Sequence, residues 1–418
     1  MNPKLAADNA TNYPRSSLEK PRVTLTLLID LDNTLLDNDM DKFIPAYIQA
    51  LGKQMAPYTD TRKLAPVMMA ATQNMFTNTD PRRTLKEAFD PDFYPKLGIT
   101  ETEVRPTLTQ FYDEVFPDLK TVAQSRPEAQ TLIETAFARG WRVAIATSPL
   151  FPQAAIQHRL NWAGVPAQKY PYAIIPSFES FHFTKPNPAY FAELLGRFGW
   201  PRGATVMVGN DADHDIRGAQ LIGIPTFWIS NGQPYPEGFP APSASGKLED
   251  LIPWLDATPE NQLLPDYTSP SAITAVMTGI PAALAALTDN LSPETWLHQP
   301  TENEWSLTEI ACHQRDVERE INLPRLQKMI NSLNPFIPGI DSDAWAKERG
   351  YQSQDGPAAL HDFVTARMET LNLLNSLTPE DWQRSAQHAI FGPTNLREIA
   401  SIIASHDRLH IRQVYALT

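Results

Sequence analysis

The stretch that most constrains the fold is an uncharged apolar run that ends in closely spaced carboxylates. Residues 25–36 read LTLLIDLDNTLL, with Asp30 and Asp32 one residue apart and Asn33 and Thr34 following. Such a run predicts a strand buried on both faces, as in a parallel sheet covered by helices. Ligands bind beyond the carboxyl ends of such strands, whereas carboxylates inside the strand would be costly buried charges. The sequence therefore predicts a functional site at this strand end.

The segments that follow alternate between helical and strand patterns. Helices are expected at 127–140, at 152–163, from Pro188 onward and within 218–223, followed by a short helix at 247–255. Strands are expected at 141–148, 172–176, 204–209 and 224–226, and the last of these is expected to be the last strand of the sheet. This alternation predicts an α/β fold for residues 22–257, with a Rossmann-like, doubly wound parallel sheet. Residues 1–21 are expected to be a disordered lead-in.

Residues 37–120 form a helical insertion after the first strand. Met40, Phe43, Tyr47 and Leu51 recur at helical spacing. The segment is also rich in methionine, at positions Met40, Met55, Met68, Met69 and Met75. Ordinary helical core is the favoured account of these methionines, because Met commonly fills gaps. An adaptable surface that faces a substrate is the alternative.

Three further motifs follow in order. The second strand ends in Thr147 and Ser148, and Lys185 precedes a proline-fixed helix start in KPNPAYF, where the prolines hold the lysine in place. The strand at 204–209 leads into GNDADHD, which contains Asn210, Asp211 and Asp215. Oxygen donors at this spacing suit Mg²⁺, which keeps several waters and needs few carboxylates.

Together, these four motifs resemble those of the haloacid dehalogenase (HAD) superfamily, mostly Mg²⁺-dependent phosphatases, with residues 37–120 as a C1 helical cap. The resemblance implies that Asp30 attacks phosphorus to form an aspartyl-phosphate and that Asp32 is the general acid and base. It further implies that Thr147, Ser148 and Lys185 bind the phosphate, with support from Thr34. Mg²⁺ would lie on Asp30, the Asp32 carbonyl, Asp211 and Asp215, with Asp215 direct or water-mediated and Asn210 a further donor left open.

Asp32 separates two activities of this superfamily. The dehalogenases proper lack the second aspartate, because displacement of halide needs no acid for the leaving group. Its presence favours a phosphatase that acts on a small phosphorylated metabolite. Which metabolite is not readable, because cap residues that carry no transferable motif would select it.

Beyond a polar linker at 258–270, the sequence turns helical and strand signals vanish. Four helices are expected at 272–291, 306–332, 357–377 and 394–416, as in a bundle. The capping box at Ser306 and Glu309 places His313 inside a helix, and His406 and His410 share one helix face. These residues resemble the DinB-like four-helix family, which implies a three-histidine site for a divalent metal such as Zn²⁺ or Ni²⁺. Surface histidines are the alternative, and Cys312 is expected in the core.

Composition narrows the class of partner. The chain has 418 residues and a net charge of −13, which argues against nucleic acid and anionic membranes, because phosphate binding needs clustered Lys and Arg. A single cysteine and an N-terminus without an apolar signal region fit the cytoplasm. The apolar run 272–287 is expected to be too short for a membrane span. The oligomeric state stays open, with a dimer as one alternative.

Two functional hypotheses follow. In the first, the protein is a phosphatase and the bundle is an accessory metal-binding domain. In the second, the bundle carries the main function, as a metal-dependent thiol transferase or a metal sensor, and the HAD-like part regulates it. Intact motifs in the first part of the chain favour the first hypothesis.

Overall fold

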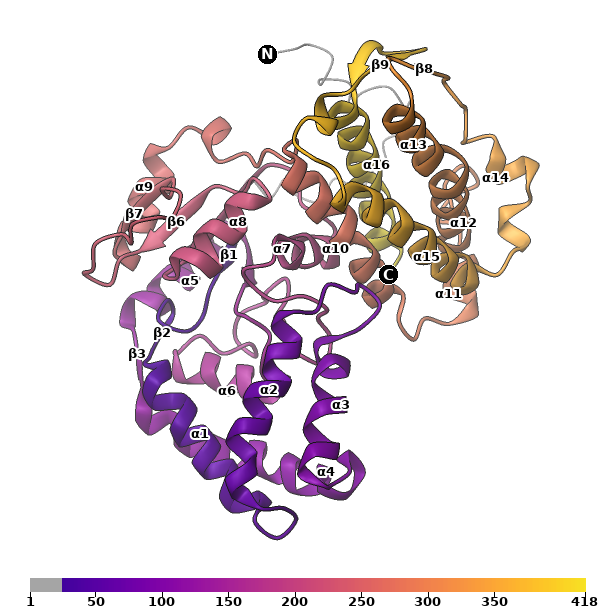
Figure 1. Cartoon of the computed structure of the whole chain (residues 1–418). Coiled ribbons are helices and arrows are strands. Elements are labelled where there is room, and N and C mark those ends of the chain that lie inside the picture. Colours follow the sequence, from indigo (N-terminus) through magenta and orange to yellow (C-terminus); the bar gives the residue numbers. More distant parts are fainter. Residues whose placement is uncertain (1–24) are drawn as a thin grey trace.

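The structure, a computed structural model, describes residues 25–418, so the predicted lead-in lies outside the described residues. Its first lobe contains a five-stranded sheet of order β4-β1-β5-β6-β7, in which all neighbouring strands are parallel (Figure 1). The strands are β1 (Leu25–Ile29), β4 (Arg142–Ile145), β5 (Ala204–Gly209), β6 (Thr226–Ile229) and β7 (Ala244–Gly246). The expected α/β fold with a parallel sheet is confirmed.

Strand β1 lies in the sheet interior, and its side chains enter two separate cores. Leu27 packs in one core with Val206, and Leu28 packs in the other with Met207, because successive side chains of a strand point to opposite faces. The Leu27 core includes helices α5 (Pro127–Ala138), α6 (Gln153–Trp162) and α9 (Leu251–Ala257), and the Leu28 core includes α7 (Pro188–Arg197) and α8 (Gly218–Leu221). Helices therefore cover both faces, as a doubly wound sheet requires.

Two strand expectations in this lobe were wrong. Residues 172–176 form no strand, although Ala173 donates to the Val143 carbonyl (2.8 Å) and the Ile174 carbonyl accepts from Ile145 (3.1 Å). The segment lies along the edge of β4 without a continuous ladder. The sheet also does not end at β6, because β7 pairs with it.

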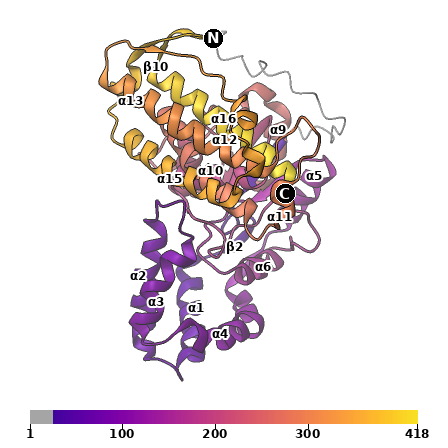
Figure 2. The ribbon, with the colours of Figure 1, turned by 90° about the vertical axis from the view of Figure 1, so that its right-hand side faces the viewer.

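The helical insertion forms a cap beside the sheet. It begins and ends in a two-stranded antiparallel ribbon of β2 (Leu36–Asn38) and β3 (Ala123–Ser125). Its helices are α1 (Met40–Met55), α2 (Leu64–Phe76), α3 (Leu85–Leu97) and α4 (Glu101–Gln110), followed by a π-helical turn (Phe111–Val115) and a 3-10 helix (Phe116–Val122). Figure 2 shows the four cap helices as one group below the bundle. Thr79, between α2 and α3, lines a pocket together with residues of α10 and α15.

The second lobe is a helical bundle. Its main helices are α10 (Pro270–Thr288), α12 (Leu307–Val317) continued through a wide turn into α13 (Leu323–Asn331), α15 (Gly356–Asn375) and α16 (Leu396–Leu417), with short helices α11 (Pro293–Leu297) and α14 (Trp345–Glu348). All four expected helices are present. The expectation that strands vanish was wrong, because β8 (Phe336–Ile337), β9 (Ser385–His388) and β10 (Gly392–Asn395) form a small sheet.

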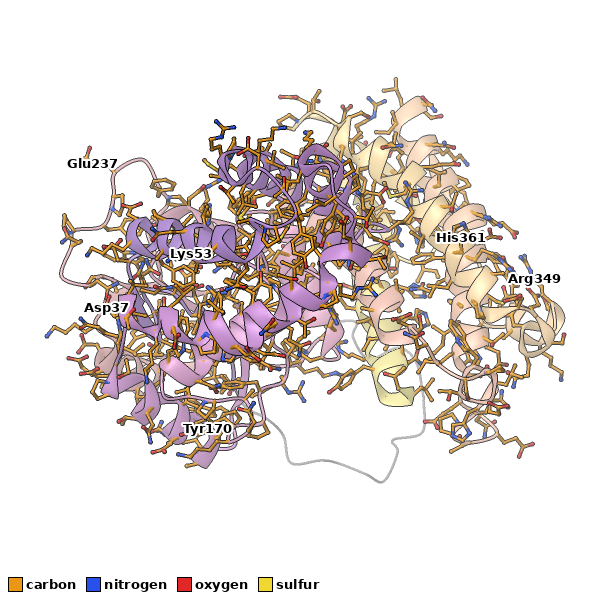
Figure 3. All side chains as sticks on the ribbon, turned by 90° about the horizontal axis from the view of Figure 1, so that it is seen from below. Asp37, Lys53, Tyr170, Glu237, Arg349 and His361 are labelled. Carbon is orange, nitrogen blue, oxygen red and sulfur yellow. The ribbon has the colours of Figure 1, made fainter. Side chains whose placement is uncertain are left out.

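The two lobes share one hydrophobic core. Helix α10 of the bundle packs directly on α7 of the sheet lobe, and one cluster of buried side chains runs from Leu28 to the bundle interior. A Cβ on Gly279 would lie 2.6 Å from the Ala192 Cβ, and one on Gly196 would lie 2.7 Å from the Ala283 Cβ. Small residues therefore bring the two helices into close contact. Figure 3 shows the labelled Lys53 on the sheet and cap side and His361 on the bundle side.

The segment expected as a linker packs on the sheet lobe. Leu263 is buried there, and its carbonyl accepts from the Thr205 backbone amide at 3.0 Å. Asp266 donates its backbone N–H to the Gly223 carbonyl, where a Cβ on Gly223 would lie 1.8 Å from the Asp266 oxygen. These contacts fix the chain that leads into α10.

Helix α10 meets the length and composition criteria for a membrane-spanning helix. With 19 residues, it is long and apolar enough to cross a bilayer, so the expectation that the run was too short was wrong. However, 67% of its most apolar window is buried inside the protein. Its packing against α7 and α16 accounts for the apolar composition, as in the core helix of a globular lobe.

Candidate active site and metal centre

Asp30 is the first residue beyond β1, and its carboxylate lies in a buried polar cluster. Its backbone N–H still donates to the Val208 carbonyl of β5, which fixes the residue to the sheet. One carboxylate oxygen accepts from Lys185 Nζ at 2.8 Å, and the other accepts from Thr34 Oγ1 at 3.1 Å. The strand end therefore presents one carboxylate, held on both oxygens, at the carboxyl edge of the sheet.

Lys185 connects Asp30 to a second buried carboxylate. Its ammonium also donates to Asp215 Oδ1 at 2.6 Å. Burial raises the pKa of Asp30 to about 7; Lys185 opposes this rise and Asp215 adds to it. Burial by itself would lower the pKa of Lys185, but Asp215 and Asp30 together raise it. The cluster thus holds two carboxylates on one ammonium, and a further cation would relieve its excess negative charge.

Asn210 faces the same place as Asp30. Its Oδ1 lies 3.2 Å from Thr34 Oγ1, so oxygens of Asn210 and Asp30 converge on one hydroxyl. The Asn210 carbonyl accepts from the Trp228 indole N–H at 2.6 Å, which fixes the backbone there. Converging carboxylate and amide oxygens beside excess negative charge fit a Mg²⁺ ion.

The two aspartates after Asn210 have different surroundings. Asp215 is buried, and besides Lys185 it accepts from the Asp211 backbone N–H at 2.9 Å. Asp211 is exposed, and its Oδ1 accepts from the backbone amides of Asp213 and His214 at 2.9 and 2.8 Å, so it caps the following turn. Asp215 therefore positions Lys185. The assignment of Asp211 as a metal ligand stays a prediction.

Asp32 is held by two residues that sequence reasoning did not include. Arg159 of α6 pairs with Asp32 Oδ2, and Asn38 donates to Asp32 Oδ1 at 2.7 Å. The guanidinium of Arg159 lies over the ring of Phe151, with its carbon 4.6 Å from the ring centroid. Arg159 recurs at helical spacing with Ala155 and other buried residues of α6, so an arginine on a buried helix face was a usable signal.

The hydroxyl residues after β4 lie near the same edge. Ala146 donates its backbone N–H to the Ile29 carbonyl at 2.7 Å, which places the following Thr147 and Ser148 beside the end of β1. Thr147 is buried, and its carbonyl accepts from the Tyr190 hydroxyl of α7 at 2.8 Å. The structure therefore brings together the strand ends that carry the first, second and fourth motifs, with Lys185 between them.

The bundle contains a second candidate site made of three histidines. His313 of α12 and His406 and His410 of α16 place their ligand atoms within 4.8 Å of one another. The Nε2 atom of His406 lies 3.1 Å from that of His313 and 3.0 Å from that of His410. Burial lowers the pKa of all three, to about 3 for His406, so the rings are neutral and each keeps one nitrogen without a proton. Converging neutral imidazoles are the donor set of a Zn²⁺ or Ni²⁺ site.

Neighbouring groups orient this triad. The Gln413 Oε1 lies 2.7 Å from His410 Nδ1, and Trp305 stacks parallel to the His410 ring. Beside it, the buried Arg367 pairs with Glu318 at 2.8 Å and also with Asp407, the residue after His406. This buried ion network ties α15 and α16 to the turn after α12. No pattern in the sequence indicated this network.

Cys312 lies in the core, as expected. It is fully buried, its sulfur is 3.5 Å from Gln354 Oε1, and burial raises its pKa to about 11. A thiol in this state is a poor nucleophile.

A large apolar cavity lies inside the cap, with a volume of about 370 Å³. It is bounded by cap helices and by the loop after β4. Its lining includes Met40, Met68 and Met69 from the methionine-rich segment, whereas Met55 and Met75 are buried in the core. The core interpretation therefore holds for Met55 and Met75, whereas a role of Met40, Met68 and Met69 toward a substrate stays a prediction.

Comparison with known proteins supports both resemblances. A family model described as haloacid dehalogenase-like hydrolase matches residues 24–223, and one described as DinB superfamily matches residues 278–414. A phosphoserine phosphatase from Thermus thermophilus is 28% identical over 106 residues, or 25% of this chain. The match spans 41% of that relative, less than half its length.

Two solved structures illustrate the similarity of each lobe. The 2-haloacid dehalogenase from Pseudomonas syringae pv. Tomato DC3000 is 22% identical, covering 56% of this chain and 99% of its own, with a TM-score of 0.39. YfiT from Bacillus subtilis, a four-helix bundle, is 17% identical, covering 36% of this chain and 87% of its own, with a TM-score of 0.34.

Proposed function

Because this chain belongs to the haloacid dehalogenase-like hydrolases in residues 24–223 and to the DinB superfamily in residues 278–414, we propose that it is a Mg²⁺-dependent phosphatase. Its substrate would be a small phosphorylated metabolite, cleaved through an aspartyl-phosphate. The observation that carries the proposal is the buried Asp30 carboxylate, held by Lys185 and Thr34 at the end of β1. Asp32 lies two residues further on.

In the first step, an oxygen of Asp30 bonds to phosphorus and the bond from phosphorus to the leaving oxygen breaks. Asp32 donates its proton to the leaving oxygen. Lys185, with Thr147 and Ser148, binds the phosphoryl oxygens. Asp30 and Asn210 would hold Mg²⁺ together with the Asp32 carbonyl, and the ion would offset the charge that develops on the phosphoryl group.

In the second step, Asp32 takes a proton from water, whose oxygen attacks phosphorus and releases phosphate and the free Asp30 carboxylate. Arg159 and Asn38 hold the Asp32 side chain, which fixes the direction of both proton transfers. Asp215 keeps Lys185 charged and in place. Each buried polar group of the cluster thereby has a role in the cycle.

The direct test is phosphate release from p-nitrophenyl phosphate and a panel of sugar and nucleotide phosphates, with Mg²⁺ or with EDTA. The proposal expects turnover that needs Mg²⁺ and disappears with the chelator. Folded protein that binds Mg²⁺ but releases no phosphate from any ester would contradict it.

Replacing Lys185 with methionine should impair both activity and stability. The change leaves two buried carboxylates without their cation, so we expect a loss of about 3 kcal/mol or more in the free energy of unfolding and at least ~100-fold in kcat. Chemical denaturation and p-nitrophenyl phosphate turnover measure the two effects. The exposed Lys169, which pairs with Glu134, provides the control Lys169→Met. Equal behaviour of the two variants would count against the role of Lys185.

The histidine triad favours a second, independent activity. Three neutral imidazoles from two helices leave coordination positions open, which suits a reactive metal rather than a closed structural one. The bundle would then act as a metal-dependent transferase for an external thiol or as a metal sensor. Suppose that the protein binds stoichiometric Zn²⁺ or Ni²⁺ and has a thiol-dependent activity but no phosphatase activity. The function of the bundle would then be the main function of the protein.

The triad also makes a direct prediction about metal binding. The metal-stripped full chain should bind one equivalent of Zn²⁺ or Ni²⁺, and His410→Gln should weaken this affinity by more than about 100-fold, because losing a ligand costs more than losing a residue behind it. Isothermal titration calorimetry measures both. His361 is exposed on α15, so His361→Gln should bind as the wild type does. Unchanged affinity in His410→Gln would remove the triad as the site.

A further inference from the structure

The cavity inside the cap lies next to the residues that hold Asp32. Asn38, which donates to Asp32, has its amide nitrogen 3.6 Å from the sulfur of Met40, and Met40 lines the cavity. Phe151, which stacks under the guanidinium of Arg159, lines it from the other side. In the proposed reaction, Asp32 gives its proton to the leaving oxygen. The group attached to that oxygen must therefore extend toward this cavity.

The lining of the cavity offers no charge. Among the described residues, its walls are aliphatic, aromatic and methionine side chains, with Thr72 and Gln73 as neutral polar members. The hydroxyls of Tyr47 and Tyr112 hydrogen-bond to each other at 2.9 Å. Burial raises the pKa of both phenols, of Tyr47 to about 12, so they stay neutral. A zwitterion such as phosphoserine would lose the solvation of its ammonium and carboxylate there without ionic partners.

The cavity is also too large to be a packing defect. Protein interiors contain few voids larger than a water molecule, whereas ligand pockets occupy about 300–1,000 Å³ and are mostly apolar with a few polar groups. At about 370 Å³, this cavity falls in the second range. It is bounded by the cap on one side and by the loop of Leu150 and Phe151 on the other, just after Thr147 and Ser148. The backbone N–H of Leu150, which lines the cavity, donates to the Ser148 carbonyl at 2.8 Å, so the cavity adjoins the proposed phosphate site.

We propose that the substrate is a phosphate monoester of an apolar alcohol, with a long alkyl chain or an aryl group that fills the cap cavity. This inference rests on the proposed function and narrows its substrate class. Small charged esters, phosphoserine among them, would be poor substrates because their leaving group has no partner in the cap.

The test compares esters of increasing apolar length on the full chain with Mg²⁺: ethyl, butyl and octyl phosphate, with O-phosphoserine beside them. The inference expects kcat/KM to rise by on the order of threefold for each added methylene, and to be lowest for phosphoserine. Phosphoserine or ethyl phosphate turned over as well as octyl phosphate would overturn it, while leaving the phosphatase proposal in place.

Two variants on one helix locate the effect. Thr72→Trp places a large ring in the cavity from α2 and should flatten the dependence on chain length. Ala70→Trp, on the exposed side of α2, should keep the wild-type dependence. Should Thr72→Trp fail to fold, Ile48→Ser on α1 with Gln49→Ser as its control serves the same purpose, because Ile48 lines the cavity and Gln49 is exposed. Equal chain-length dependence in a lining variant and its control would contradict the assignment.

Binding separates the two proposals if no ester is turned over. Calorimetry with octylphosphonate and ethylphosphonate then tests the cavity without chemistry. At least tenfold tighter binding of the octyl compound, lost in the folded lining variant and kept in its control, would support the apolar site even though the phosphatase proposal had failed. Equal binding of the two phosphonates would overturn the inference.

Discussion

Asp30→Asn should lower phosphate release from p-nitrophenyl phosphate by at least ~10⁴-fold while the protein stays folded. The amide has nearly the same shape as the carboxylate but is a far weaker nucleophile, so the covalent step is lost. Steady-state release with Mg²⁺ measures activity, and circular dichroism checks the fold. Asp37→Asn is the matched control, because Asp37 is an exposed aspartate on the same segment.

Comparing Asp30→Asn with Asp37→Asn distinguishes loss of the nucleophile from a general effect of removing a carboxylate. Wild-type activity in Asp37→Asn with none in Asp30→Asn would assign the loss to one carboxylate. Substantial activity in Asp30→Asn would mean that water attacks phosphorus directly.

Gly279→Val should destabilise the whole molecule by about 3 kcal/mol or more. A Cβ at this position would lie 2.6 Å from the Ala192 Cβ and 2.6 Å from the Glu193 backbone nitrogen, and backbone cannot move aside as a flexible side chain can. Because one core spans both lobes, phosphate release and bundle metal binding should be lost at the same temperature. Differential scanning calorimetry and the two activity assays measure this.

Ala286→Val provides the control for that change. Ala286 is half-buried further along α10, and a valine there costs only the small helix penalty of a branched side chain. Equal melting temperatures of Gly279→Val and Ala286→Val would show that the protein tolerates a larger separation of α7 and α10. Two independent transitions in the wild type would contradict a shared core.

The elements that could be predicted from the sequence are those with local signals. The bundle helices have helical spacing of apolar residues and recognisable caps, such as Ser306 with Glu309, and all four are present. Residues 172–176 and β9 show why strands are harder. The former has the right composition but only two sheet hydrogen bonds. Strand β9 (SAQH) has no strand-like composition and forms between its neighbour β10 and the distant β8.

The site shows the same division. The first motif and Lys185 were readable, because a turn after a buried strand and two prolines are local features. Spacing alone could not separate Asp211 from Asp215, since both satisfy the acidic pattern. Their different roles appear only in the structure, where Asp215 accepts a hydrogen bond from Lys185 and Asp211 caps its own turn. Arg159 recurs with the buried residues of α6, but its partner Asp32 lies 127 residues earlier, so no local pattern indicated that the two residues pair.

The packing of α10 on α7 had no local signal at all. Each helix is apolar enough to be an ordinary core helix, and only the three-dimensional fit of Gly279 and Gly196 to facing alanines identifies the pair. A contact between lobes depends on complementary surfaces from distant parts of the chain. Sequence patterns therefore predicted two lobes with a linker between them, whereas in the structure one of the two cores of the sheet lobe continues into the bundle.

The central claim is that Asp30 carries the phosphoryl group, and trapping that intermediate tests it most directly. Enzyme mixed with substrate and Mg²⁺ would be quenched rapidly and treated with borohydride, which reduces an acyl phosphate to an alcohol. The account predicts that peptide mass spectrometry finds homoserine at position 30 and aspartate at position 32. Phosphate release in the same mixture with an unmodified Asp30 would contradict it.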